Sequence, residues 1–185
     1  CRFQLGDTEF GRRAYESGHV PGAVYAHLDA LLSNPPVTDN GRHPLPPAEI
    51  LIERFSRLGI DGSKQVVAYD DKNGMIAARL WWLLRYLGHE AVAVLDGGWP
   101  AWLAAGQPLR SGTEENTLVQ FTGTPRKEWV VLAADVQMAL AEKGYDVTAS
   151  AENGCVSLSV DRKVFRFHRM SEKLKHLVGG IPDVA

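Results

Sequence analysis

The stretch QVVAYDDKNGMIAARLWWLLRYLG, residues 65–88, decides the fold. Its first five residues, 65–69, form an apolar run that is typical of a short strand buried in a parallel sheet. Residues 74–87 are rich in Ala, Leu and Trp and predict a helix. A loop between a buried strand and a helix N-terminus is a common place for a nucleophile. This loop, however, carries Asp70 and Asp71 and no Cys or Ser.

Helix and strand patterns alternate on both sides of this stretch. We expect helices at 9–17, 47–58 and 98–105, one or two helical turns at 27–33, and strands at 23–26 and 91–95. Short apolar strands that alternate with helices indicate an α/β fold, with an open parallel sheet covered by helices on both faces. We expect Trp81 and Trp82 to lie in the core, against the sheet.

The composition changes after Gln107. Residues 110–125 are polar and turn-rich and predict a linker. A helix is expected at 133–143, and the alternating run GCVSLSV, residues 154–160, is typical of a strand. The basic stretch Arg162–Lys175 is read as a solvated helix face, because charge runs usually are.

The gross composition limits the possible partners. The 185 residues are 45% hydrophobic and 23% charged, with a net charge of −2, so we expect neither nucleic acid nor a membrane surface as partner. No apolar run approaches the ~18 residues that span a bilayer. Two cysteines are too few for a disulfide framework, which favours a reducing, cytoplasmic location. The first residue is Cys rather than Met, so we expect any targeting signal to be invisible here.

Several motifs together resemble a rhodanese domain. They are CRF at 1–3, SGHVPGAVYAHLD at 17–29, GRHPLPP at 41–47, and the run from YDDKNG through DGGWPAW at 69–102. More narrowly, they resemble the N-terminal half of a tandem-domain thiosulfate or 3-mercaptopyruvate sulfurtransferase. The resemblance covers residues 1–109 and implies an open α/β fold with a central parallel sheet.

A weak internal repeat extends the resemblance toward the end of the chain. Arg2 precedes Gly18-His19-Val20-Pro21 much as Arg162 precedes Gly179-Gly180-Ile181-Pro182. We therefore expect residues 126–185 to be the start of a second, diverged or truncated rhodanese-like copy. That second domain would be a partner within the same protein.

The resemblance also implies sulfur transfer. In the family, a Cys at a strand end takes a sulfane sulfur, becomes a persulfide, and passes the sulfur to cyanide or a thiol, without a cofactor. Backbone N–H groups and the positive end of the following helix stabilise such an anion. Tandem members carry this Cys only in their C-terminal copy. A small sulfur-containing substrate is expected for the parent sulfurtransferase.

The loop residues Asp70, Asp71, Lys72, Asn73 and Gly74 are therefore interpreted as a degenerate active loop. Counting back three from Gly74 places Asp71 at the nucleophile position, whereas counting from the strand end places Asp70 there. A carboxylate cannot form a persulfide, so we expect no catalytic residue and no thiosulfate:cyanide activity in this chain. The structural alternative is that an Asp caps the helix that follows.

Other site hypotheses rest on single features. Paired carboxylates at 70–71 suit Mg²⁺ or phosphoryl chemistry, but without supporting residues, so no metal is expected.

His19 is expected either to lie near an interdomain cleft or simply to bond the turn backbone. His89 is expected to cap a helix C-terminus. Neither cysteine is expected to be catalytic: Cys1 is expected at the end of the first strand, away from the loop, and nothing near Cys155 would lower the pKa of its thiol. The alternative function is a catalytically inactive rhodanese-like module that binds or regulates another protein.

Overall fold

The computed structural model describes residues 1–37, 41–143, 147–152 and 155–160. The chain divides into two compact units. The first comprises residues 1–35 and 43–125, and the second comprises residues 36–42 together with those from 126 onward. The basic stretch Arg162–Lys175 and the repeat near Gly179 lie outside the described residues.

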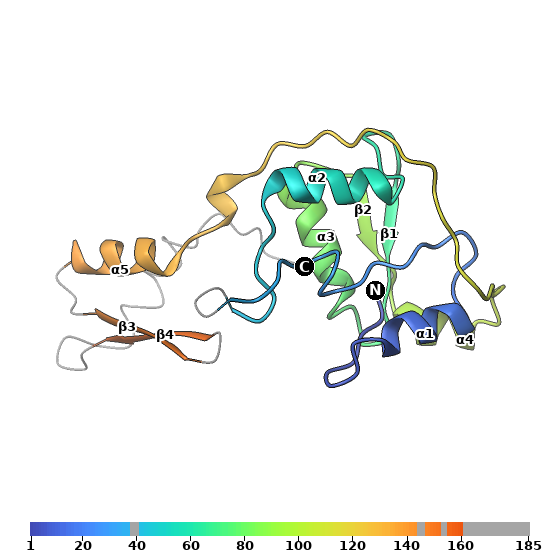
Figure 1. Ribbon diagram of the computed structural model, residues 1–185, viewed down its shortest axis with the longest axis horizontal. Helices are drawn as coiled ribbons and strands as arrows, with labels where there is room; N and C mark the ends of the chain where they lie inside the picture. Colours follow the sequence, from blue (N-terminus) through green and yellow to red (C-terminus); the bar gives the residue numbers. More distant parts are fainter. Residues whose placement is uncertain (38–40, 144–146, 153–154, 161–185) are drawn as a thin grey trace. The chain divides into compact units, whose positions relative to one another are not determined.

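The first unit is an α/β arrangement, as predicted. Its elements are α1 (Phe10–Ser17), α2 (Ala48–Arg57), β1 (Val66–Ala68), α3 (Ala77–Tyr86), β2 (Val92–Val94) and α4 (Gly98–Ala104) (Figure 1). Strands β1 and β2 pair in parallel, with Val66 opposite Val92 and Ala68 opposite Val94. Helix α3 is the crossover between them, because parallel neighbours cannot be joined by a tight hairpin.

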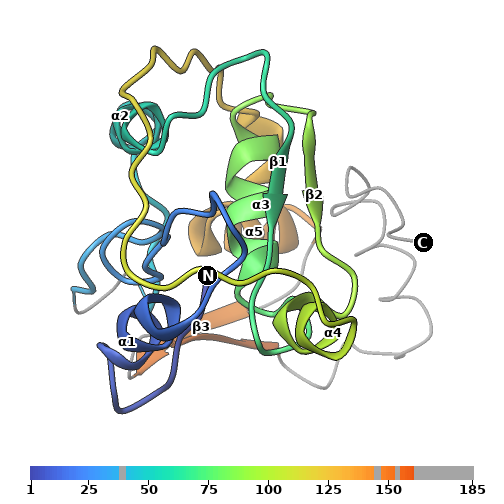
Figure 2. The same ribbon diagram turned by 90° about the vertical axis from the view of Figure 1, so that its right-hand side faces the viewer.

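Helix α3 packs along the β1–β2 pair, which Figure 2 shows from the side. Its buried stripe is made by small and aliphatic residues, among them Ala77, Leu80 and Leu83. The two tryptophans were expected in the core, but both are only half-buried, because they lie at the margins of this stripe. Trp82 stacks on Tyr86, and the Arg85 guanidinium lies over the Trp81 ring.

The predicted strand at 23–26 is not formed as part of a sheet. These residues have no regular assignment, and the sheet that includes β1 has two strands within the part of the chain that the structure describes. A cavity of about 210 Å³, lined by residues 22–24, Ala26 and 64–69, separates this segment from β1. Without a neighbour across that space, residues 23–26 have no ladder of hydrogen bonds to join. Residues 27–33, expected to be helical turns, form turns and bends rather than a helix.

Residues 110–125, which we expected to be a linker, lie on the first unit as an irregular segment. Residues His19 and Arg110 exchange both backbone N–H···O bonds, at 2.8 and 3.0 Å. Further along, Phe121 is 2% exposed and packs edge-on against Phe55. The Ser56 hydroxyl accepts the Phe121 N–H. This polar segment is held to the first unit by backbone hydrogen bonds and by the buried aromatic ring of Phe121.

The second unit contains a 3₁₀ turn η1 (Lys127–Trp129), helix α5 (Ala133–Ala141) and strands β3 (Val147–Glu152) and β4 (Cys155–Val160). The Asp135 carboxylate accepts the Leu132 N–H at the start of α5. Strands β3 and β4 pair antiparallel, with Val147 opposite Val160. A second rhodanese-like copy is not confirmed by these elements and stays a prediction.

No helix in the described ranges has both the length and the apolar character needed to cross a bilayer.

Candidate functional site

The Asp70 side chain lies inside the loop that joins β1 to α3. It is 0% exposed, and its two oxygens accept four backbone N–H groups. Oδ1 accepts those of Lys72 and Gly74 at 2.8 and 2.9 Å. Oδ2 accepts those of Ile76 and Ala77, both at 2.7 Å. The loop therefore wraps one carboxylate, and we call these four N–H groups the Asp70 cradle.

The cradle explains where the helix begins. We expected a helix from residue 74, but α3 begins at Ala77, and the side chain of its N-cap residue, Ile76, accepts no hydrogen bond. Residues 74–76 instead turn so that the Gly74 and Ile76 N–H groups, with that of Ala77, face Asp70. Asp70 thus satisfies unpaired donors at the helix start from a position seven residues upstream, rather than as an adjacent N-cap.

The charge on Asp70 is set by two opposing effects. Burial raises the pKa of this carboxyl, but the bonds from the Ala77, Lys72, Gly74 and Ile76 N–H groups together outweigh burial, so the pKa lies below its ordinary value. The carboxylate form is therefore the one that the loop stabilises at neutral pH. The positive end of α3 adds to this preference.

Asp71 faces a different partner. Its Oδ2 accepts from Arg2 Nε at 3.0 Å, whereas its buried Oδ1 has no hydrogen-bond partner among the described residues. Arg2 also donates to the Ala14 carbonyl at 2.6 Å, and its guanidinium lies over the Trp99 ring. Of the two positions that the sequence left open, only Asp70 occupies the cradle.

The remaining loop residues contribute backbone rather than side-chain chemistry. Lys72 and Asn73 are both exposed. Asn73 has a φ of 55° and Gly74 a φ of 82°, so two successive residues adopt the left-handed region. The left-handed conformation of Asn73 turns the Gly74 N–H back toward Asp70 Oδ1, which also accepts the Lys72 N–H.

A second turn, formed by two glycines after β2, lies against the backbone of Asp70. Gly97 and Gly98, at φ 64° and 53°, make the tight passage from β2 into α4 that the sequence predicted. A Cβ on Gly98 would lie 2.5 Å from the Asp70 carbonyl oxygen. The same carbonyl accepts the Trp99 N–H at 2.8 Å. Only glycine allows α4 to approach Asp70 this closely.

His19 is fully buried in the first unit and bonds the backbone. Its Nδ1 lies 2.9 Å from the Tyr15 carbonyl, and its ring stacks on that of Tyr15. Its Nε2 lies 3.6 Å from a Glu114 oxygen. A role for His19 in an interdomain cleft stays a prediction, and the buried ring offers no surface to a substrate.

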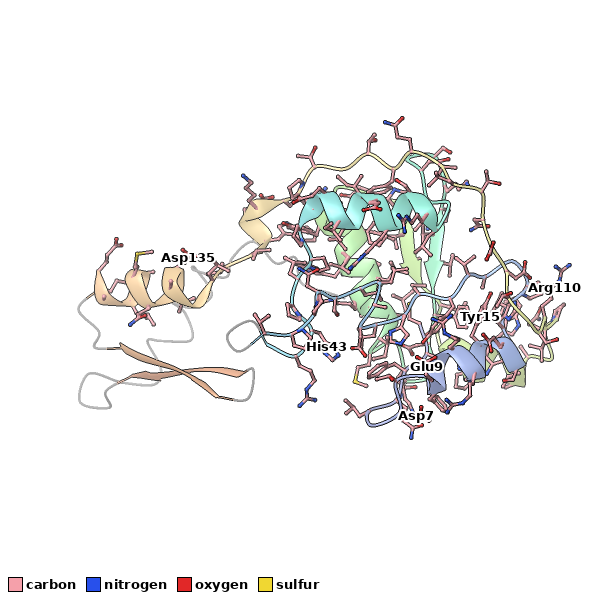
Figure 3. All side chains as sticks on the ribbon, viewed as in Figure 1. Asp7, Glu9, Tyr15, His43, Arg110 and Asp135 are labelled. Carbon is pink, nitrogen blue, oxygen red and sulfur yellow. The ribbon has the colours of Figure 1, made fainter. Side chains whose placement is uncertain are left out.

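Tyr15 and the partly exposed Glu114 complete this second cluster, which sequence reasoning missed. The Tyr15 hydroxyl donates to the Ala23 carbonyl and accepts the Glu114 N–H. The Gly22 N–H donates to the Glu114 carboxylate, and this bond, more than the nearby Arg110 charge, lowers the pKa of Glu114. Figure 3 labels Tyr15 on α1 and Arg110 on the segment that runs beside it. No local motif signals contacts between residues about one hundred positions apart.

Two further expectations, on His89 and Cys1, have structural outcomes. The His89 side chain bonds the Ala91 carbonyl, so the helix end is capped by the His89 backbone N–H on the Leu84 carbonyl instead. Cys1 was expected away from the loop, but its amine donates to the Tyr69 carbonyl at 2.8 Å, next to Asp70. The Cys155 side chain lies outside the part of the protein whose side chains are described.

The arrangement gives little support to a metal site. The described residues hold no group of three or more His, Cys, Asp and Glu side chains suited to a metal ion. Both oxygens of Asp70 are already occupied by N–H donors, and Asp71 is paired with Arg2. What the loop can do chemically is hold one buried anion at the end of a strand.

Comparison with known proteins gives consistent matches. Residues 4–105 match the rhodanese-like domain family. A probable 3-mercaptopyruvate sulfurtransferase of Pseudomonas aeruginosa is 43% identical over 147 residues, which cover 78% of this chain and 51% of that relative. The human 3-mercaptopyruvate sulfurtransferase is 33% identical over 145 residues, covering 77% of this chain and 48% of the relative.

Solved structures agree with these relatives. The 3-mercaptopyruvate sulfurtransferase from Leishmania major superposes with a TM-score of 0.60 at 36% identity, covering 68% of this chain and 34% of that one. SseA from Escherichia coli, described as a 3-mercaptopyruvate sulfotransferase, gives a TM-score of 0.62 at 33% identity, covering 71% and 50%. The chain spans about half the length of the curated relatives named here. On this basis the chain belongs to the rhodanese-like domain family, and its relatives are 3-mercaptopyruvate and thiosulfate sulfurtransferases.

Proposed function

We propose that this chain supplies the non-catalytic N-terminal domain of a thiosulfate or 3-mercaptopyruvate sulfurtransferase. One observation carries the proposal: the cradle at the strand end, suited to a sulfur anion, is filled by the Asp70 carboxylate. The relatives' names supply the substrate class, and their greater length leaves room for a catalytic partner domain in the same protein.

The chemistry excludes Asp70 as the sulfur carrier. Thiolate attack on thiosulfate forms an S–S bond and releases sulfite, and cyanide then removes the outer sulfur as thiocyanate and restores the thiolate. A carboxylate oxygen cannot form the corresponding persulfide. With both its oxygens bonded to N–H groups, Asp70 holds the loop in shape instead.

A cyanolysis assay tests the proposal directly. The purified protein is offered thiosulfate or 3-mercaptopyruvate with cyanide, and thiocyanate is measured. We expect no more thiocyanate from the native protein than from the double variant Cys1→Ser, Cys155→Ser. Thiocyanate well above that control would contradict the proposal, because one of these two cysteines would then carry sulfur.

A gain-of-thiol variant tests the cradle itself. In Asp70→Cys, the four N–H groups and the helix end should lower the thiol pKa below the ordinary ~8.5. The pH dependence of alkylation measures this, with Asp70→Ser as the matched variant without a thiol at that position. If the new thiol titrated like an exposed cysteine, the cradle would not be a site for anionic sulfur.

A further inference from the structure

The exposed tip of the Asp70 loop contains a chemically vulnerable dipeptide. Asn73 is exposed and is followed by Gly74, which has no side chain to shield its backbone nitrogen. In an Asn–Gly pair, that nitrogen can attack Cγ of the Asn. The sequence contains two other such pairs, Asn40–Gly41 and Asn153–Gly154.

The reaction has a defined atom balance. A bond forms between the Gly74 nitrogen and Asn73 Cγ, the Cγ–Nδ2 bond of Asn73 breaks, and ammonia leaves with the proton from the Gly74 N–H. The five-membered succinimide then takes up water at either carbonyl and opens to aspartate or isoaspartate. Ring closure requires that the Gly74 nitrogen lose its proton and rotate toward the Asn73 side chain.

Two contacts oppose those requirements here. The Gly74 N–H donates to Asp70 Oδ1 at 2.9 Å, so removing its proton would leave two negative charges facing each other. The Lys72 N–H donates to the same oxygen at 2.8 Å, so the residues before and after Asn73 are both held to one atom. Asp70 is 0% exposed, so water does not weaken these bonds by competition.

We propose that Asn73 is a latent deamidation site that Asp70 protects by holding the Gly74 N–H. The protection matters because the product would damage the loop. Isoaspartate adds one carbon to the backbone between residues 73 and 74. The Lys72 and Gly74 N–H groups could then no longer meet at one oxygen, and the cradle would lose donors.

The test compares rates at position 73 in different contexts. The 185-residue protein and a synthetic peptide of residues 69–79 are incubated at neutral pH, and mass spectrometry with peptide mapping separates Asn, Asp and isoaspartate. We expect the rate in the folded protein to be lower by at least about tenfold, the factor that one hydrogen bond to a charged group represents.

A variant pair assigns the protection to Asp70. We expect Asp70→Ser to raise the rate at position 73 toward the peptide value, while Asp71→Ser, which removes a carboxylate that accepts no loop N–H, leaves it unchanged. The rates at Asn40 and Asn153 in the same digests serve as internal references and should not respond to Asp70→Ser. Circular dichroism checks that the variants are folded.

Three results would overturn the proposal: equal rates in the folded protein and the peptide, no acceleration in a folded Asp70→Ser variant, or the same acceleration in Asp71→Ser. If Asp70→Ser does not fold, hydrogen exchange in the native protein decides. The Gly74 amide must then exchange more slowly than that of Asn73, and a Gly74 amide that exchanges as in the peptide would refute the protection. These outcomes are independent of whether the protein transfers sulfur.

Discussion

Asp70 and His19 are both completely buried polar side chains, but the protein satisfies them in different ways. Asp70 receives four N–H groups, all from a continuous stretch of backbone within seven residues. The His19 side chain has one backbone hydrogen-bond partner, the Tyr15 carbonyl. Its second ring nitrogen lies 3.6 Å from the Glu114 carboxylate, on an irregular segment far along the sequence. The difference indicates that the loop around Asp70 is organised locally, whereas the His19 cluster depends on residues 110–116.

The largest effect expected from this comparison is that of Asp70→Ala. Removing the carboxylate leaves up to four N–H groups without a partner, and losing one member of a buried charged network costs about 3–5 kcal/mol. The free energy of unfolding, measured by urea denaturation, should fall by that amount. Asp71→Ala, which loses one bond to Arg2, is the matched control and should cost roughly 1–2 kcal/mol. Equal losses in the two variants would break the comparison.

The pH dependence of the unfolding free energy of Asp70→Ala tests whether the charge of Asp70 is the cause of this loss. Because the pKa of Asp70 is lowered in the folded state, its carboxylate contributes fully above the unfolded value of about 4. That contribution is lost as the pH falls through the folded pKa. The difference in unfolding free energy between the native protein and Asp70→Ala should therefore be constant near neutral pH and shrink in acid. A difference that does not change with pH would show that the charge is not responsible.

Gly98→Ala tests how closely α4 depends on the Asp70 backbone. Its Cβ would meet the Asp70 carbonyl at 2.5 Å in addition to the strain of a positive φ, and we expect a loss of about 2–3 kcal/mol. Gly106 has a φ of 61° but open space around it, so Gly106→Ala should cost only about 1 kcal/mol. Thermal unfolding of the pair measures the difference, and equal shifts would mean that the contact contributes nothing.

The smallest effect is expected at the other cluster. Glu114→Gln weakens the bond from the Gly22 N–H and removes the charge beside His19. Hydrogen exchange at the Gly22 amide should become faster, because that amide loses a charged acceptor. The Lys72 and Gly74 amides, which are bonded to Asp70, should keep their native rates. A change at all three positions would show that the two clusters are coupled rather than separate.

The sequence was informative wherever a pattern is local. The alternation of apolar runs and helical patterns predicted β1, α3 and β2. The expected burial of these strands was wrong in part, because Val67, in the middle of β1, is 53% exposed. The family match over residues 4–105 agrees with the motifs that suggested it. The strand at 23–26 was not formed, because an extended segment becomes a strand only when a neighbour supplies hydrogen bonds. The tryptophan pair was misplaced, because the hydrophobic character of a helix residue does not fix its position on the buried face.

The sequence pointed to the loop after β1 but not to its geometry. The family resemblance predicts that an aspartate stands where a nucleophile is expected, yet spacing alone left Asp70 and Asp71 equivalent. The structure separates them, because the left-handed turn at Asn73 aims the Gly74 N–H at the Asp70 oxygen that also accepts the Lys72 N–H. The pairing of Asp71 with Arg2 joins residues 69 positions apart, and no local pattern in the sequence encodes it.

The side chain and the backbone carbonyl of residue 70 have separate structural roles. Its side chain holds the start of α3, and its carbonyl oxygen, through the Trp99 N–H, holds the start of α4. A backbone carbonyl is the same for every amino acid, so an exchange of the side chain alters the chemistry of the loop without removing the joint to α4. Residue 70 is therefore a position at which the loop chemistry can be redesigned while the contact with α4 is kept.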